Sequence, residues 1–551
     1  MEKEVMSPLK RFVGLLQLEK KDVTQVMFYA IFAGIVSLSL PLGVQAIINL
    51  LQGAQVTTSW VLLVVLVSLG VAFGGLLQLM QLRIIETIQQ RIFTRSSFEF
   101  AFRFPKINAD ELRAYYPPEL ANRFFDTIVV QKGLSKILID VPAAVIQILF
   151  ALILLAFYHP FFILFGLMLI ILVYIVFKFT ASKGLKTSIE ESKYKYKVAH
   201  WLQEIARMVT SFKVSGKTSL ALQKNDELVI KYLEKREEHF KVLVIQFIQM
   251  ISFKVIVTIS LLILGGLLVL NQQMNIGQFV AAEIIILLVI ASVEKLILSL
   301  EVFYDVLTSL EKLGEVVDKE LENQEGDTPL ISDEFNLELK NVSYQVPNRN
   351  DPILNVIDLE INTQSKVLIK GESGSGKSTL LRILAGIIKP TKGSLYINDF
   401  SMDNLKINHY RSYIGLVLLE ETLFEGTLRE NIVFNNDSVA DNELFEILQN
   451  LGLKDFVKSL PNGLNTMIFP DDKQVSYTVS KRLLIARAIV KQPKLLILEE
   501  PLEHLEENET KDIIDYLSHP KHEWGIVIVS RNPYWETKCN HIVQLNNGQI
   551  S

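Results

Sequence analysis

Long apolar stretches alternate with charged segments through the first 300 residues of the chain. Six of the stretches are long enough for a helix of about 20 residues to cross the hydrocarbon layer of a membrane. They fall near residues 24–50, 60–82, 138–158, 160–180, 244–270 and 276–300. The pattern predicts an all-α transmembrane domain of six helices over residues 23–320.

The positive charges of this half gather on one side of the predicted membrane. Lys and Arg crowd the N-terminus and the long segments 83–137 and 181–243, whereas the other connections are short and nearly uncharged. Positively charged loops stay in the cytoplasm, so both termini are expected there. The two long segments keep helical periodicity and are interpreted as membrane helices prolonged into the cytoplasm. Turn formers at 115–120 and 210–215 are candidate coupling elements, the alternative being solvated hairpins without a partner.

Residues 1–22 mix leucines and phenylalanine with lysines and an arginine. No long apolar core with a cleavage site follows the first methionine, so no signal peptide is predicted. The mixture favours a short interfacial helix at the inner membrane surface, and a poorly ordered tail is the alternative.

Glu283 is the clearest case of an ionisable residue within a predicted span. It follows the outer loop 271–275 by eight residues, about 12 Å at the rise of an α-helix. A buried carboxylate in a membrane faces a partner or water. An interhelical hydrogen bond is the simpler interpretation, and contact with a transported substrate is the alternative.

The pattern changes after residue 320, where apolar runs shorten. Residues 321–335 predict a linker, and 336–551 predict a soluble α/β domain. Within it, KVLIKGESGSGKSTLLRIL reads as a strand, a glycine-rich turn and a helix start, in the P-loop spacing. The motif supplies Gly371, Ser373, Gly374, Ser375, Gly376, Lys377, Ser378 and Thr379.

This P-loop predicts a site for ATP with Mg²⁺. Its glycines let successive backbone N–H groups point at phosphates, together with the helix N-terminus. Lys377 adds a cation, and the Ser378 hydroxyl is a magnesium ligand.

Composition excludes two other classes of function. The net charge is −5, with acidic and basic residues mixed, so nucleic-acid binding has no support. A single cysteine, Cys539, excludes an internal disulfide framework or a thiolate metal cluster.

Several motifs together resemble the ABC exporters. They are the P-loop, LFEGTLRENI at 423–432, IARAIVKQPKLLILEEP at 485–501 and HIVQLNNGQI at 541–550. The resemblance implies a six-helix membrane domain followed by an α/β ATP-binding domain with a β-subdomain. It also implies that Tyr344 stacks on adenine. Among exporters, the chain resembles peptide and protein secretion transporters without their peptidase domain.

The chain departs from this family at four positions. Leu419 stands at the position of a glutamine that contacts magnesium, with Glu420 as a neighbouring substitute, and Val475–Val479 replaces the LSGGQ signature. Glu499 stands where an aspartate holds the magnesium water shell, and Arg531 stands at the switch histidine. Glu500 keeps the position of the general base. ATP binding is therefore expected, and hydrolysis by the isolated chain is expected to be weak or absent.

Two functions remain open from the sequence. The first is an exporter half that pairs with a second half-transporter, a heterodimer being favoured, and moves a peptide, protein or lipophilic substrate. The second is a catalytically impaired, ATP-binding scaffold or regulatory subunit. A membrane-anchored kinase or GTPase is disfavoured, because six spans exceed what an anchor requires.

Overall fold

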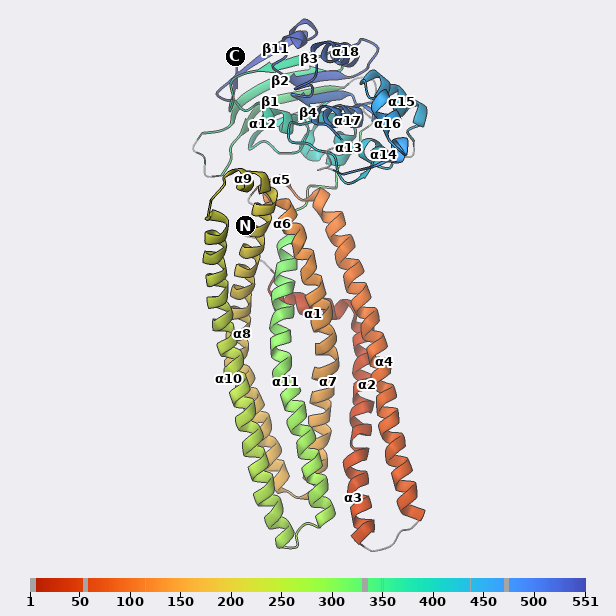
Figure 1. Ribbon diagram of the computed structural model, residues 1–551, viewed down its shortest axis with the longest axis vertical. Coiled ribbons are helices and arrows are strands. Elements are labelled where there is room, and N and C mark those ends of the chain that lie inside the picture. Colours follow the sequence, from red (N-terminus) through yellow and green to blue (C-terminus); the bar gives the residue numbers. More distant parts are fainter. Residues whose placement is uncertain are drawn as a thin grey trace. The chain divides into compact units, whose positions relative to one another are not determined.

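A computed structural model describes residues 6–52, 58–113, 115–329, 335–347, 349, 351–436, 438–469 and 475–551. The chain divides into two compact units (Figure 1). The first comprises Met1–Lys106 and Ala114–Lys319, and the second comprises Ile107–Arg113 and Glu320–Ser551. Residues 1–5 of the predicted interfacial helix and residues 330–334 of the predicted linker lie outside the described residues.

The first unit is built of helices. They are α1 (Pro8–Leu18), α2 (Lys20–Ser37), α3 (Ser39–Gln52), α4 (Thr58–Arg103), η1 (Phe104–Lys106), α6 (Pro117–Ala121), η2 (Asn122–Phe125), α7 (Asp126–Tyr158), α8 (Phe161–Arg207), α9 (Val209–Val214), α10 (Leu220–Leu270) and α11 (Ile276–Val317). Six helical segments are long and apolar enough to cross a membrane. This confirms the six predicted spans.

The first span is broken, which the apolar run alone does not predict. Helix α2 ends at Ser37, and α3 begins at Ser39 after Leu38. Pro41 lies in the first turn of α3, and proline lacks the N–H that a continuous helix would need there. At the break the Leu38 N–H donates to the Ile35 carbonyl at 3.2 Å, and the Ser37 hydroxyl donates to the carbonyl of Gly34 at 2.7 Å.

Three of the spans continue without interruption into their charged segments. Helix α4 has 46 residues, α8 has 47 and α10 has 51. None of the three contains a proline, the residue that most often kinks a helix. At 1.5 Å per residue each is about 70 Å or more in length, against about 30 Å for the hydrocarbon core.

Helix α11 is the central packing element of this unit. It packs against α7, α3, α10 and α8, and α10 packs against α8 (Figure 1). Its buried residues recur from Gly277 to Val316. A helix that is buried over so much of its surface lies inside a bundle rather than at its edge.

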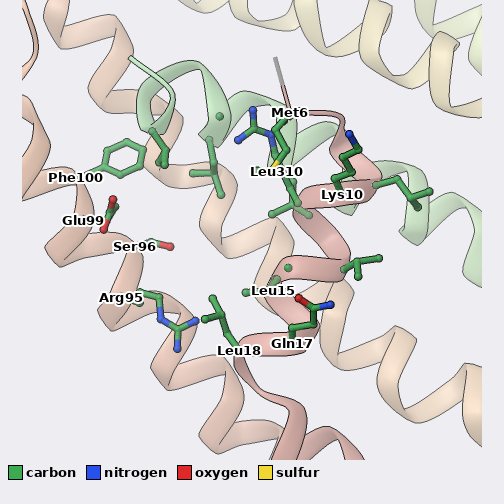
Figure 2. Close-up of a pocket in the computed structure, with 17 residues that line it drawn as sticks. Met6, Lys10, Leu15, Gln17, Leu18, Arg95, Ser96, Glu99, Phe100 and Leu310 are labelled. Atoms are coloured by element: carbon green, nitrogen blue, oxygen red, sulfur yellow. Dashed lines mark hydrogen bonds between the residues drawn. The ribbon is translucent and has the colours of Figure 1, made fainter. Parts of the chain in front are cut away.

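Helix α1 packs with its apolar side against this bundle. Phe12 is buried, with its ring edge-on to Phe303 of α11 at 5.1 Å. Arg11 bonds to the Asp318 carboxylate, 2.9 Å from Nη1 to Oδ1. Around the helix lies a cavity of about 710 Å³ lined by residues of α1, α4 and α11 (Figure 2). Leu9 and Leu18 remain exposed, as a membrane-surface helix would require.

The second unit contains three sheets. Their strands are β1 (Asn336–Tyr344), β2 (Leu354–Asn362), β3 (Lys366–Lys370), β4 (Lys392–Ile397), β5 (Phe400–Ser401), β6 (Ile414–Val417), β7 (Gly426–Thr427), β8 (Met467–Ile468), β9 (Leu495–Glu499), β10 (Gly525–Val529), β11 (His541–Asn546) and β12 (Gln549–Ile550). Six strands run in the order β12-β11-β3-β10-β9-β6, and all neighbours are parallel except β11 and β12. The antiparallel sheet β2-β1-β4-β5 forms the β-subdomain, and β7 pairs with β8.

The helices of the second unit lie on the six-stranded sheet or beside it. They are α12 (Lys377–Leu384), α13 (Ile407–Ser412), α14 (Leu428–Val433), α15 (Asp441–Asn450), α16 (Lys454–Ser459), α17 (Tyr477–Ile489) and α18 (Glu507–Leu517), with the short α5 (Ala109–Leu112) and the 3₁₀ helices η3 (Met402–Asn404), η4 (Gly463–Asn465) and η5 (Pro533–Thr537). Alternate residues of β9 face two separate cores, Leu496 and Leu498 one and Leu495 and Ile497 the other. A parallel strand buried on both faces is the arrangement typical of α/β proteins. The predicted fold class is therefore confirmed.

The described part of the predicted linker is fastened to the second unit. Asp327 bonds through its backbone to Asn404 and Lys406, at 2.8 and 3.1 Å. Glu322 forms a two-pronged ion pair with Arg411, at 2.6 and 2.8 Å. Residues 320–329 therefore belong structurally to this unit.

Candidate functional site

The P-loop joins β3 to α12 at the carboxyl edge of the parallel sheet. Gly376 caps the helix with a φ of +104°, and a Cβ there would lie 2.9 Å from the Ile353 carbonyl oxygen. Gly371 has a φ of +155°, and its Cβ would lie 2.2 Å from the Leu545 oxygen. Both positions exclude side chains, because the left-handed backbone and the neighbouring carbonyls leave no room.

The other predicted loop residues follow this turn closely. Ser373 and Gly374 are exposed at its tip, Ser375 is buried, and Thr379 is half-buried in the first turn of α12. The Lys377 ammonium donates to the carbonyls of Gly371 and Glu372, at 2.8 and 2.7 Å. The lysine therefore curls over the loop that would hold the phosphates.

Ser378 and Glu499 are brought together from opposite sides of β10. The Ser378 hydroxyl donates to Oε1 of Glu499, the last residue of β9. The second carboxylate oxygen accepts the backbone N–H of Leu419 at 3.3 Å. Glu499 is only 6% exposed. One buried carboxylate thus links the P-loop helix to the segment that follows β6.

Lys481 extends this network, and the sequence analysis missed it. It is 2% exposed, on α17. Its ammonium donates to the carbonyls of Leu418 and Leu419, at 3.2 and 2.6 Å. The only signal in the sequence was that Lys481 stands shortly before the apolar run 483–485.

Glu500 and Arg531 are also close neighbours. Glu500 has a left-handed backbone with a φ of +41°, a conformation that costs energy in a residue with a side chain. Its Oε2 accepts the Arg531 backbone N–H at 3.3 Å, and Arg531 Nε lies 3.9 Å from Oε1. Burial raises the pKa of the Glu500 carboxyl, and the bond from Arg531 acts in the opposite direction.

The segment predicted to replace the signature begins helix α17. Ser476 is the N-cap, and its hydroxyl oxygen accepts the Val479 N–H at 3.3 Å. Tyr477 takes the first helical position, so the fold does not need glycine there. Its side chain is 46% exposed and packs edge-on to His504, with ring centroids 5.7 Å apart. The ring therefore occupies space that a glycine would leave open.

Two predicted residues have partners that the sequence did not indicate. Tyr344 ends β1 and is 3% exposed, and the Arg113 guanidinium lies 4.9 Å from its ring centroid. Glu420 pairs with Arg382 of α12 at 3.1 Å. Adenine stacking by Tyr344 stays a prediction, as does a role for Glu420 beside Leu419.

Glu283 is half-buried on α11. It has no hydrogen bond or ion pair with any residue that the structure describes. The interhelical bond considered from the sequence is therefore not seen within the described part of the chain. Elsewhere in the spans, Lys254 of α10 and Glu294 of α11 pair with each other at 2.9 Å.

The donor set fits a magnesium ion that arrives with phosphate oxygens. Ser378 offers a hydroxyl and Glu499 a carboxylate, the hard oxygen ligands that Mg²⁺ prefers. Among the described residues, no group of three or more histidine, cysteine or carboxylate side chains is placed to hold a metal. The protein oxygens would therefore complete a coordination shell rather than form one alone.

Comparison with protein families matches both halves of the chain. Residues 23–293 match the ABC transporter transmembrane region, and residues 354–503 match the ABC transporter family model. The two models follow each other in the order that the apolar runs and the P-loop predict.

Curated relatives include bacterial secretion proteins. The alpha-hemolysin translocation ATP-binding protein HlyB of Escherichia coli O157:H7 is 30% identical over 306 residues, covering 56% of this chain and 43% of the relative. The leukotoxin translocation ATP-binding protein LktB of Mannheimia haemolytica is 27% identical over 351 residues, covering 63% and 49%. The chain thus matches less than half the length of these relatives.

A solved structure shares the fold. A bacterial Atm1-family ABC exporter with ATP bound has a TM-score of 0.83 at 18% identity, covering 97% of this chain and 94% of that one. With a six-helix membrane region and an ATP-binding domain fused in one polypeptide, the chain belongs to the ABC transporters.

Proposed function

We propose that this chain is an ATP-driven exporter half that pairs with a second half-transporter and turns over ATP slowly on its own. The observation that carries the proposal is the meeting of Lys377, Ser378 and Glu499 at one edge of the parallel sheet. These groups form a phosphate site in a chain that also carries six membrane spans.

ATP binding follows from the polarity of this edge. Backbone N–H groups at the start of α12 point at incoming phosphates, and the helix dipole favours their negative charge. Lys377 would exchange its bonds to Gly371 and Glu372 for phosphate oxygens. Ser378 and Glu499 would hold Mg²⁺, which neutralises charge on the phosphates when it is bound. Tyr344 would contact the adenine.

Glu500 is the residue best placed to polarise an attacking water. Its raised pKa makes the ionised carboxylate a stronger base than an exposed glutamate. Arg531 would neutralise charge on the terminal phosphate, but arginine does not release a proton near pH 7. ATP hydrolysis is therefore expected to be slow, because Arg531 does not provide the hydrogen-bond relay of a switch histidine.

Export is the proposed direction, with both termini in the cytoplasm. Support comes from the fused order of the two parts, the uninterrupted helices α4, α8 and α10, and the positive charges of their extensions. Two relatives are named for the translocation of hemolysin and leukotoxin. A peptide or protein is therefore the first proposed substrate class, before a lipophilic small molecule. Glu283 is a candidate contact.

A heterodimer is proposed because of Tyr477. In this family the signature segment of one half meets the P-loop of the other. Two copies of this chain would place the tyrosine ring beside both nucleotides. A partner half with an intact LSGGQ signature would instead place glycines beside this P-loop. One of the two nucleotide sites of the pair would then close well.

The alternative function is a silent, ATP-binding regulatory subunit. It is favoured by the combination of Tyr477 and Arg531, which alters both sides of the nucleotide site. The two functions share ATP binding and differ in whether Glu500 contributes to turnover.

ATP binding and turnover by the full chain in lipid nanodiscs test the proposal. Lys377→Ala should weaken ATP binding at least tenfold, whereas Lys389→Ala, an exposed lysine of the same unit, should not. Glu500→Gln should abolish the slow turnover without weakening binding. Unaltered affinity of Lys377→Ala would contradict the proposed site, and fast turnover by the chain alone would contradict the impaired signature.

Purification in mild detergent tests the partner. Recovery of a second half-transporter with an intact signature supports the heterodimer. A pure homodimer that transports at full rate contradicts it.

A further inference from the structure

A second cavity lies among the charged extensions of α8, α10 and α11 and the short helices α6 and η2, with a volume of about 580 Å³. This size is within the range of about 300–1,000 Å³ that small-molecule sites occupy. Its wall carries six basic side chains, which are Arg123, Lys193, Lys197, His200, Lys224 and Lys312. Only three carboxylates, those of Glu119, Glu204 and Glu315, share the wall.

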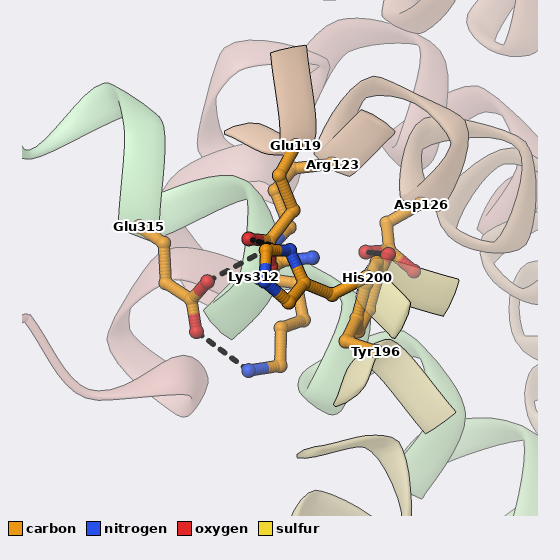
Figure 3. Close-up of polar contacts among 7 residues, drawn as sticks. All are labelled: Glu119, Arg123, Asp126, Tyr196, His200, Lys312 and Glu315. Carbon is orange, nitrogen blue, oxygen red and sulfur yellow. Dashed lines mark hydrogen bonds and ion pairs between the residues drawn. The ribbon is translucent and has the colours of Figure 1, made fainter. Parts of the chain in front are cut away.

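Two of these carboxylates, Glu119 and Glu315, are already paired (Figure 3). Glu119 lies 3.2 Å from Arg123 Nη2 and 3.0 Å from His200 Nδ1. Glu315 lies 2.8 Å from Arg123 Nε and 2.5 Å from the Lys312 ammonium. Each glutamate thus faces two basic groups, and neither has spare charge for the lysines of the wall.

The remaining acidic groups are engaged elsewhere. Glu204 bonds to Arg207, which does not line the cavity, at 3.1 Å from Nε. Asp126, behind the wall, accepts a hydrogen bond from the Tyr196 hydroxyl. On the same side, the Arg123 guanidinium lies over the Tyr196 ring, 3.7 Å from its centroid.

Three lysines of the wall lack an ion-pair partner among the described residues, although the Glu204 carboxylate lies within electrostatic range of Lys224. Within the described part of the chain, Lys193, Lys197 and Lys224 form no ion pair. Lys197 lies over the ring of Tyr194 at 4.4 Å, and Lys224 over Trp201 at 4.2 Å. Lys193 and Lys197 are four residues apart on α8, a spacing at which like charges destabilise a helix. Arg123 adds a buried Nη1 atom with no acceptor among the described residues.

We propose that this cavity binds a small soluble compound that carries several phosphate charges. Three unpaired ammonium groups around one hollow attract a polyanion, and their repulsion is relieved when it binds. Trp201, which is 8% exposed, and Tyr115 supply flat apolar surface beside the charges. The site is made of residues of the first unit only and does not rest on the proposed function.

A soluble compound is favoured over a lipid headgroup by position. Arg123 precedes the predicted span at 138 by 15 residues, about 20 Å along a helix axis. Headgroups extend only a few ångströms beyond the hydrocarbon layer, roughly 5–8 Å on each side. Because the wall includes residues of α8, α10 and α11, an occupant would tie the extensions of these three helices together.

Calorimetric titration of the full chain with tripolyphosphate tests the site. The Lys377→Ala variant is the starting protein, so that the P-loop does not compete for the probe. Saturable binding is expected, and it should weaken with added salt. Combined Lys193→Ala, Lys197→Ala and Lys224→Ala substitutions should weaken it at least tenfold.

Two matched variants keep the test decisive. Lys183→Ala, Lys186→Ala and Lys231→Ala remove three exposed lysines of α8 and α10 that do not line the cavity, and they should leave binding unchanged. Replacement of the three cavity lysines by arginine should retain binding and shows that the fold tolerates change there. Absence of saturable binding, or equal loss in both alanine triples, would overturn the proposal. Binding of anionic lipid nanodiscs without any binding of tripolyphosphate would overturn it as well.

Discussion

The Lys481 ammonium donates a hydrogen bond of 2.6 Å to the carbonyl of Leu419, a residue 62 positions earlier in the chain. The same leucine gives its N–H to Glu499. Leu419 is therefore held at both ends of its backbone while its side chain stays 42% exposed. The backbone at the position predicted to correspond to the family's glutamine is thus held in place from two sides.

Lys481→Met should release this segment. Hydrogen bonds to a charged donor contribute about 1.5–3 kcal/mol each, and the two carbonyls would be left without their partner. Amide hydrogen exchange at residues 418–421 should become at least about tenfold faster, measured by mass spectrometry on the full chain. Lys458→Met, at an exposed position of α16, should leave exchange there unchanged. Equal protection in both variants would show that the tether is unimportant.

Tyr477→Gly combined with Thr478→Gly should raise ATP turnover by at least about tenfold, if the proposed function holds. The change removes the ring beside His504 and opens the approach to the start of α17. Glycine at two helical positions costs about 1 kcal/mol each, so the matched control is Lys454→Gly with Asp455→Gly at the start of α16. A folded double variant without faster turnover would show that the tyrosine does not limit the rate.

Residual turnover should depend on pH through Glu500. A general base acts in its ionised form, and burial raises the pKa of this carboxyl. The rate should therefore begin to fall, on acidification, at a higher pH than an exposed glutamate would give, with its pKa of about 4.3. Glu500→Gln should give a flat profile near background. A parent profile without an acidic limb would exclude this role.

His522 should make the second unit sensitive to acid. Burial lowers the pKa of His522 to about 4, and its ring stacks on Trp524 at 4.0 Å. The unfolded chain, with a pKa near about 6.5, binds the proton more readily. The stabilisation is thus fully present above pH 6.5 and lost as the pH falls toward 4.

Calorimetry of the full chain between pH 5 and 7.5 checks this. The transition temperature of the second unit should fall on acidification, and His522→Phe should reduce that fall. His541→Phe, at an exposed position, should behave as the parent chain does. Identical slopes in all three proteins would remove His522 as the cause.

Most of the fold can be predicted from local patterns in the sequence. Apolar runs long enough to span a membrane indicate the six helices, because hydrocarbon leaves a backbone few other choices. The P-loop glycines likewise encode their own turn. Pro41 indicates the break after Ser37, but it stands within a continuous apolar run, which predicts one unbroken span.

Contacts between distant segments could not be predicted in the same way. Nothing near Lys481 in the sequence points to Leu419, and nothing near Glu420 points to Arg382. The cavity lysines lie on α8 and α10, which the pattern shows only as charged helices. Side chains of this kind acquire meaning from tertiary packing, whereas spans and turns are specified by neighbours in the chain.

The proline-free course of α10 has a mechanical consequence. A helix of 51 residues without a proline moves as one stiff rod. If it pivots by about 5° at one end, its other end, about 75 Å away, sweeps about 6 Å. That is roughly one helical turn. A rotation small enough to preserve side-chain packing at the pivot can therefore open or shut a passage at the far tip.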